Sequence, residues 1–257
     1  MSWTLQELFA RKSVRAYEKR PIAQTEKTAI LRASLEAPTA GNMTMLTILD
    51  ITDPSLKQTL VKTCDNQPFI ASAPLVLVFL ADYQRWYDAY RYECKDGEQP
   101  RMPKAGDFML AASDALIAAQ NAVVAAESLG IGSCYIGDIL ENFEEHQKLF
   151  HLPKYVLPVA MLCFGYPTNQ QLERLKPARF DPKFIVQENT YSRVDRKTLR
   201  TAFTERAQRA GKENYSYPAE IQEMMKRKYQ SDFSREMSRS VAAMLKSWCS
   251  ERDDELL

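Results

Sequence analysis

Glycine is scarce in this chain of 257 residues. It occurs only 8 times, whereas an average usage of about 7% would give roughly 18. None of the glycines falls in a G-x-G-x-x-G or a G-x-x-x-x-G-K pattern, the patterns that place backbone amides against nucleotide phosphates. The sequence therefore lacks both the usual dinucleotide fingerprint and a P-loop.

Histidines and closely spaced cysteines are also few. The chain has two histidines, His146 and His151, and five widely spaced cysteines without a C-x-x-C pair, which argues against a zinc site. Both histidines fall in one predicted helix and the turn after it, so we expect surface or helix-end residues rather than a hydrolase centre. The odd cysteine count and the lack of a signal-peptide pattern predict reduced thiols in a cytoplasmic protein.

The net charge is close to zero, because 34 Lys and Arg residues are balanced by 33 Asp and Glu residues. A net charge of +1 provides no general field for nucleic acid or an anionic membrane. We therefore expect neither partner, and any site for an anion has to be local.

Length and composition predict a folded core with a helical extension. An apolar content of 45% is enough for one large domain or two small ones. The charged fraction rises and long apolar runs stop at Arg193. We expect a core over residues 1–192 and a helical arm over 193–257 that is not an independent domain, with amphipathic helices at 221–229 and 237–248.

The predicted elements of the core are mixed. Thr4 and Glu7 fit a capping box for a helix that ends near Ala10, and a second helix is expected over 25–36, before Pro38. Short apolar or alternating runs predict strands at 45–52, 75–81 and 159–164. The sequence therefore predicts a core that contains both helices and strands.

Residues 107–129 predict a long helix that is apolar over most of its circumference, with one narrow polar stripe. Its length could span a bilayer, but the acidic and amide groups along its middle would be costly in lipid. We assign it to a protein core or a subunit interface, and Gly130 ends it.

Cations cluster where the first predicted helix ends. Arg11, Lys12 and Arg15 stand within five residues around Ser13, and guanidinium groups offer paired donors to phosphate oxygens. Such a segment alone is most often a solvated basic turn. Further along the chain come a loop of small residues at 37–42, an amide pair at 66–67 and a second cationic stretch at 176–179.

In this order the segments resemble the FMN-dependent nitroreductase family, and most closely its branch of NADPH-dependent oxygen-insensitive nitroreductases and flavin reductases. The resemblance covers roughly residues 4–192. Seven motifs carry it: Arg-Lys-Ser-Val-Arg-Ala-Tyr at 11–17, Ala-Pro-Thr-Ala-Gly-Asn at 37–42, Asn-Gln-Pro at 66–68, Ala-Ala-Glu-Ser-Leu-Gly-Ile-Gly at 125–132, Tyr-Ile-Gly at 135–137, Phe-Gly-Tyr-Pro at 164–167 and Lys-Pro-Ala-Arg at 176–179.

The resemblance implies an α+β fold, with a central, mainly antiparallel sheet flanked by helices, in an intertwined homodimer that holds one non-covalent FMN per subunit. It implies an enzyme that uses NADPH or NADH to reduce nitroaromatics, quinones or free flavins in a two-electron ping-pong cycle. The flavin would carry the chemistry, so no catalytic side chain and no metal ligand is expected. A reductive dehalogenase or flavin-degrading enzyme of the same fold, and a non-catalytic flavin-binding protein, stay open as alternatives.

The resemblance also assigns residues to the cofactor: Arg11, Ser13, Arg15, Ala40, Gly41, Asn42, Gln67, Tyr135, Ile136, Gly137, Asp138, Lys176 and Arg179. The first three and the last two would hold the phosphate and the ribityl chain or the polar edge of the ring, and the others would line the isoalloxazine. Asp138 stands where that branch often has glycine, which would bring a carboxylate near the ring. In the basic tail, Arg235 and Arg239 would bind the 2′-phosphate of NADPH.

Overall fold

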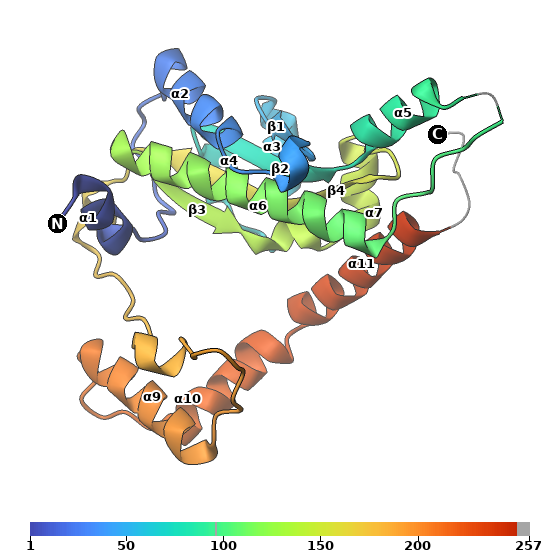
Figure 1. Ribbon diagram of the computed structural model, residues 1–257. Coiled ribbons are helices and arrows are strands. Elements are labelled where there is room, and N and C mark those ends of the chain that lie inside the picture. Colours follow the sequence, from blue (N-terminus) through green and yellow to red (C-terminus); the bar gives the residue numbers. More distant parts are fainter. Residues whose placement is uncertain (96, 251–257) are drawn as a thin grey trace. The chain divides into compact units, whose positions relative to one another are not determined.

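The computed structural model describes residues 1–95 and 97–250, which form two compact units (Figure 1). The first unit contains residues 1–174 together with the segment that starts at Arg235, and the second is Leu175–Ser234. This division falls earlier than the expected boundary at residue 192. The expected arm from residue 193 onward therefore contributes to both units.

An antiparallel sheet of four strands forms the centre of the first unit, as predicted. The strands pair in the order β1-β2-β4-β3, and their bounds are β1 (Leu46–Asp50), β2 (Leu75–Asp82), β3 (Gly132–Ile136) and β4 (Val156–Gly165). Every residue of β2 is buried, so helices have to cover both faces of the sheet. The three predicted strands are confirmed.

β4 begins earlier than the sequence suggested. The predicted run started at Val159, directly after Pro158, which cannot donate a ladder hydrogen bond. In the structure the strand passes through Pro158, where the register with β2 shifts next to Leu80. A bulge accommodates the missing N–H group.

Side chains of β2 alternate between two apolar layers. Leu75, Leu77 and Phe79 face a layer built with the helices α2 (Gln24–Leu35) and α6 (Ala105–Ser128). The intervening residues Val76, Val78 and Leu80 face the opposite layer. That second layer is covered by α3 (Pro54–Thr63), α4 (Phe69–Ser72), η2 (Gly137–Leu140) and α7 (Phe143–Leu149).

α6 is the core helix of the first unit. Its buried side is mainly alanine, including Ala115, Ala119 and Ala122, and these small side chains allow a close approach to the sheet and to α2 (Figure 1). Ser34 of α2 donates to the carbonyl oxygen of Ala118 at 2.8 Å. By length and composition α6 alone among the described helices could cross a membrane, but its packing on β2 and β4 makes it a core helix.

The remaining elements of the first unit are α1 (Trp3–Ala10), η1 (Ala40–Asn42), α5 (Gln84–Glu93), α8 (Asn169–Glu173) and, from Arg235 onward, α11 (Asp232–Cys249). The capping box expected at Thr4 is wrong. α1 begins at Trp3, so Thr4 already lies within the first turn, and among the described residues no side chain caps this helix end. In α11, the fully buried Trp248 donates its indole N–H to the carbonyl oxygen of Lys104 at 3.1 Å.

His146 corrects another expectation, because it is fully buried rather than at the surface. Its Nδ1 lies 3.1 Å from the carbonyl oxygen of Ile139, and its Nε2 lies 2.9 Å from the Thr63 hydroxyl. Burial lowers the pKa of His146, so the ring is neutral at physiological pH. This histidine joins α7 to α3.

The second unit is small and depends on aromatic contacts. Phe203 packs edge-on against Phe180 and Tyr217, with ring centroids 5.0 and 5.4 Å apart. The Arg206 guanidinium lies over Phe203 and pairs with Glu220 at 2.7 Å. Its elements are η3 (Pro182–Phe184), α9 (Arg196–Arg209), α10 (Tyr217–Met224) and η4 (Met225–Tyr229).

Candidate functional site

The basic segment near the start of the chain, residues 11–17, docks on the edge of the sheet. The backbone N–H of Val14 donates to the carbonyl oxygen of Ser133 in β3 at 2.9 Å, and Ser13 forms a β-bridge with the same residue. Gly132 makes this approach possible, because a Cβ there would lie only 2.5 Å from Cγ2 of Val14. The sheet edge therefore fixes the positions of Ser13 and Arg15.

Three of the predicted phosphate contacts gather around Cys134 and Tyr135. Burial raises the pKa of the Cys134 thiol, while the charge and hydrogen bond of Arg15, the hydrogen bond of Ser13 and the charge of Arg11 act in the opposite direction. Burial raises the pKa of Tyr135 to about 12, against the opposing charge of Arg11. Cations from the start of the chain thus lie beside β3, although both the thiol and the phenol stay protonated at neutral pH.

Lys12 has a different role from its neighbours. Its ammonium group donates to the carbonyl oxygen of Leu172 at 2.7 Å and also to that of Arg174. The Arg174 guanidinium in turn donates to the carbonyl oxygen of Ser13. These bonds fasten the basic segment to the end of the first unit and engage Lys12 with backbone oxygens.

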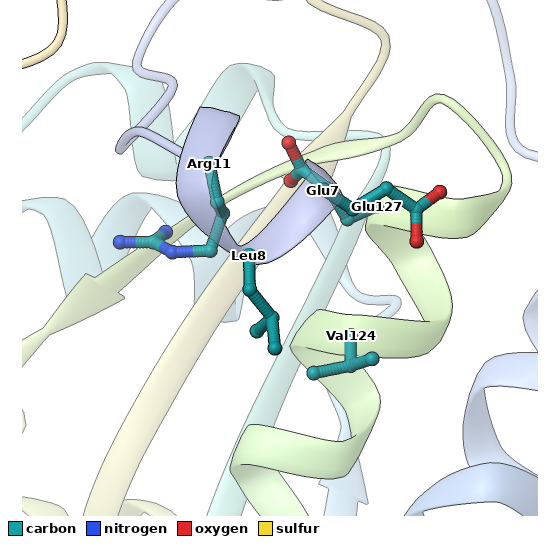
Figure 2. A pocket seen from close by; sticks show the side chains of 5 residues that line it. All are labelled: Glu7, Leu8, Arg11, Val124 and Glu127. Atoms are coloured by element: carbon teal, nitrogen blue, oxygen red, sulfur yellow. The ribbon is translucent and has the colours of Figure 1, made fainter. Parts of the chain in front are cut away.

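A surface hollow of about 180 Å³, which includes open solvent, lies where α1 meets the C-terminal half of α6. It is lined by Glu7, Leu8, Arg11, Val124 and Glu127. Figure 2 shows Leu8 directed toward Val124, whereas the guanidinium of Arg11 points away from the two carboxylates.

Gln67 and Asp138 meet although 71 positions separate them in the sequence. The side-chain amide of Gln67 donates to the Asp138 carboxylate at 2.8 Å and to the carbonyl oxygen of Cys64 at 3.1 Å. Asp65 and Asn66, which precede Gln67, have φ angles of +57° and +51°, a conformation that is rare outside glycine and frequent at functional sites. The turn presents Gln67 to the segment that follows β3.

Glu141 belongs to this neighbourhood and was missed from the sequence. Its side chain is buried, and Oε1 finds no hydrogen-bond partner among the described residues. Burial and the neighbouring carboxylates of Asp138, Asp65 and Glu236 raise the pKa of Glu141 to about 7. The available signal was the presence of two carboxylates three positions apart within an otherwise mostly apolar stretch from Ile136.

The loop of small residues is held at a different place. Asp114 of α6 accepts hydrogen bonds from the backbone N–H groups of Ala40 at 2.9 Å and Met45 at 3.0 Å. Ten residues of α6 separate Asp114 from Val124, the neighbour of Arg11, which corresponds to about 15 Å along the helix axis. Within one chain, the anchor of the loop and the helix position beside Arg11 are therefore nearly three helical turns apart, or about 15 Å.

The predicted cationic site residues in the later part of the chain belong to different units. Lys176 and Arg179 belong to the second unit, and Arg235 opens the returning segment of the first. Arg239 is engaged by carboxylates, because it donates to both oxygens of Glu144 at 2.8 Å and to Glu236 at 2.8 Å. These ion pairs occupy the donors that the expected contact with a nucleotide phosphate would need, and so argue against that role for Arg239.

Comparison with known proteins identifies the family to which the chain is similar. A family model described as the nitroreductase family matches residues 8–166. The oxygen-insensitive NADPH nitroreductase of Salmonella typhimurium is 34% identical over 199 residues, which cover 77% of this chain and 79% of that protein. The FMN reductase (NAD(P)H) of Bacillus subtilis is 28% identical over 249 residues, which cover 95% of this chain and 91% of the relative.

A solved structure described as B. megaterium NfrA2 superimposes with a TM-score of 0.81 and 25% identity, over 98% of this chain and all of the other. The NADPH:FMN oxidoreductase from Vibrio harveyi, complexed with NAD+, gives a TM-score of 0.77 at 23% identity over 97% of this chain and 99% of that one, which bears on the fold alone. The family model covers well over half of the chain, and the fold agrees with it. The chain belongs to the nitroreductase family.

Proposed function

We propose that the protein is an FMN-dependent oxidoreductase that uses NAD(P)H to reduce nitroaromatics, quinones or free flavins. The observation that carries the proposal is the docking of Ser13 and Arg15 on β3, which brings cations to the start of the segment Tyr135 to Asp138. FMN held here would supply the two-electron chemistry between a nicotinamide and the oxidant.

The residues present fit a flavin mononucleotide. Arg11 and Arg15 supply donors for a phosphate, and Ser13 supplies a hydroxyl. At Gly137, an added Cβ would meet no heavy atom of the described residues within 4 Å, so the backbone is open to a flat ring. Gln67 adds an amide at the far end of this surface.

The chain's own groups bind and orient here rather than perform acid or base chemistry. The Tyr135 hydroxyl stays protonated because burial raises its pKa to about 12, and the Cys134 thiol stays neutral because burial raises its pKa as well. Neither is a nucleophile at neutral pH. We name no catalytic side chain, and Lys176 and Arg179 stay proposed phosphate or ring-edge contacts.

Release of the chromophore tests the cofactor directly. Heat treatment of the purified yellow protein should liberate FMN. A colourless protein that leaves the fluorescence of added FMN unquenched would contradict the proposal.

Arg15→Ala tests the phosphate contact. Loss of a hydrogen bond to a charged group costs about 1.5 to 3 kcal/mol, so FMN affinity should fall roughly 10- to 150-fold. Riboflavin affinity and apoprotein stability should change little. Lys19→Ala provides the matched control, because Lys19 is an exposed cation just after the basic segment. Equal losses of affinity for riboflavin and FMN would contradict the assignment of Arg15 to the phosphate.

We also propose a homodimer. Large apolar side chains stay exposed on α1 and α6, among them Trp3 at 73% and Met109 at 61% exposure, and obligate interfaces bury such surfaces. A second copy would supply the Ala40 to Asn42 loop, whose anchor Asp114 lies about 15 Å along α6 from Val124 in one chain. Light scattering at low micromolar concentration should give twice the mass of one 29.5 kDa chain. A stable FMN-loaded monomer would contradict this.

The proposed reaction order is ping-pong, because the chain has cofactor-binding segments but no separate nicotinamide fingerprint. Double-reciprocal plots at several oxidant concentrations should be parallel, and intersecting lines would show that both substrates bind together.

Charge reversal at Arg235 should raise the KM for NADPH more than the KM for NADH. The same change at Arg239 should instead act through the loss of its ion pairs with Glu144 and Glu236.

A further inference from the structure

The amide of Gln67 is fixed in one orientation by its two neighbours. Both are acceptors, the carbonyl oxygen of Cys64 and the carboxylate of Asp138, so the nitrogen and not the oxygen of the amide has to face them. An amide nitrogen carries two hydrogens, and both are used. What Gln67 still offers to a ligand is its carbonyl oxygen, which is an acceptor only.

Asp138 depends in turn on Glu141. Asp138 and Glu141 stand three positions apart, and the Asp138 carboxyl raises the pKa of Glu141, because two adjacent carboxylates do not both ionise readily. A proton on Glu141 removes their repulsion, and the buried Oε1 of Glu141, which finds no hydrogen-bond partner among the described residues, is less costly in a neutral carboxyl than in a carboxylate.

The other groups around Glu141 do not supply a compensating positive charge. Asp65 precedes the Gln67 turn, and Glu236 on α11 is held as an anion because the hydrogen bond from Arg239 lowers its pKa. Burial raises the pKa of the Cys64 thiol to about 12 and lowers the pKa of His146, so both are neutral. The cation Arg239 is itself engaged with Glu144 and Glu236.

We propose that Glu141 is a positioning residue whose carboxyl group holds the single proton of the Asp138–Glu141 pair, and that this proton sets the acceptor that Gln67 presents to the cofactor. With Asp138 as the carboxylate, the Gln67 amide is locked and its oxygen selects a ligand with an N–H donor. The pyrimidine edge of a flavin has one such donor, N3–H, between two carbonyl oxygens. This inference rests on the proposed FMN function.

Loss of the proton should weaken cofactor binding. A second negative charge on the pair would repel Asp138 from its position and disturb the Gln67 amide. If binding requires the protonated pair, and since neighbouring carboxylates and burial raise the pKa of Glu141 to about 7, the apparent Kd for FMN should rise about tenfold between pH 6 and pH 8.

The first experiment examines the apoprotein and needs no flavin. Side-chain carboxyl carbons of Glu are followed by 13C NMR from pH 4 to pH 9, and the Glu141 signal is identified by its loss in Glu141→Gln. A midpoint near pH 7 is expected, against about 4.3 for an ordinary Glu. A Glu141 midpoint between pH 4 and pH 5 would overturn the proposal.

The second experiment measures the Kd for FMN across the same range in the wild type, in Glu141→Gln and in Glu145→Gln. Glu145 lies on α7 and is exposed, so its variant should keep the wild-type dependence on pH. Glu141→Gln mimics the protonated form and should bind FMN with an affinity that is flat with pH. N3-methyl-FMN, which lacks the donor, should bind the wild type weakly and with no rise between pH 6 and pH 8.

The outcomes separate this inference from the function on which it rests. Failure of the wild type to bind FMN at any pH would remove the proposed function and the inference with it. FMN binding that does not change with pH in the wild type would remove the inference alone. Should Glu141→Gln fail to fold, the wild-type comparison of FMN with N3-methyl-FMN decides the question by itself.

Discussion

The two parts of the candidate site within one chain are held by opposite means. The basic segment is pressed onto the sheet by close packing, since Val14 and Tyr17 occupy the space that side chains at Gly132 and Gly165 would need. The loop Ala40 to Asn42 has left-handed residues and is tied to α6 by a single carboxylate, that of Asp114. One part depends on an absence of side-chain atoms and the other on the presence of one charged group.

This difference predicts how each part fails. A closely packed segment is damaged by added volume and responds little to pH or salt. A loop whose backbone donors converge on one buried carboxylate is damaged by removal of that group, because the N–H groups then lose their acceptor inside the protein. Substitutions can therefore separate the two.

The largest effect is expected for Asp114→Ala. Hydrogen bonds to charged groups contribute about 1.5 to 3 kcal/mol each, and this variant removes the two that hold Ala40 and Met45. Urea denaturation of the apoprotein should show a loss of about 3 kcal/mol or more. Asp114→Asn keeps one acceptor oxygen and should lose clearly less, and a cost below about 1 kcal/mol for Asp114→Ala would contradict our account of the loop.

Gly132→Ala should come next. The new Cβ would lie 2.5 Å from Cγ2 and 2.9 Å from Cβ of Val14, and such overpacking costs about 1 to 3 kcal/mol. The displaced segment should also bind FMN more weakly, because Ser13 and Arg15 move with Val14. Gly106→Ala is the matched control, since no heavy atom of the described residues lies within 4 Å of its added Cβ; equal stabilities of the two variants would exclude the packing explanation.

In contrast to these two parts, the neighbourhood of Gln67 and Asp138 should respond to pH, through Glu141. Its pKa is raised from the model-compound value of 4.5 to about 7 in the folded state, first by burial and then by Asp138, so the folded protein binds more protons than the unfolded chain over this range. Its contribution to stability is then present at low pH and is lost as the pH rises from about 4.5 through about 7. Relative to the wild type, Glu141→Gln should be more stable at pH 8 than at pH 5. The opposite slope in urea denaturation would contradict the assignment.

The smallest effect on stability is expected for Gly137→Ala. Its added Cβ meets open space among the described residues, so the free energy of unfolding should change by no more than about 0.5 kcal/mol. FMN affinity should nevertheless fall, because the methyl group would stand where we propose that the ring lies against the backbone. Unchanged affinity would place the ring elsewhere.

Much of the fold could be predicted from periodicity. The long helix α6, the helix α2 and three of the strands follow from apolar runs and from stop signals such as Gly130, which has a φ of +71°. The capping box at Thr4 failed because the motif fits equally well one residue inside a helix. The helix α9 lies within the arm predicted to be helical, but its bounds could not be predicted because its surface is almost entirely polar, with only Ala202 and Ala207 buried.

The site was less accessible to sequence reasoning. Arg11, Ser13 and Arg15 could be assigned because they are adjacent in sequence and resemble a known motif. The contact of Gln67 with Asp138 and the burial of Glu141 depend on how η2 packs under α3, and no local pattern reports such a packing. The ion pairs of Arg239 with Glu144 and Glu236 also join α11 to α7. The sequence alone therefore could not show that this basic residue of the tail is paired with carboxylates.

The helix α6 restricts where residues can be inserted into this chain or deleted from it. Asp114 anchors the loop at one point of the helix and Val124 meets α1 at another, so the number of residues between them sets the spacing of the two attachment points. Deleting one helical turn would shorten that spacing by about 5.4 Å and would shift the alanine contacts with the sheet. Insertions and deletions should therefore be tolerated in the loops at the ends of α6 and rejected within it.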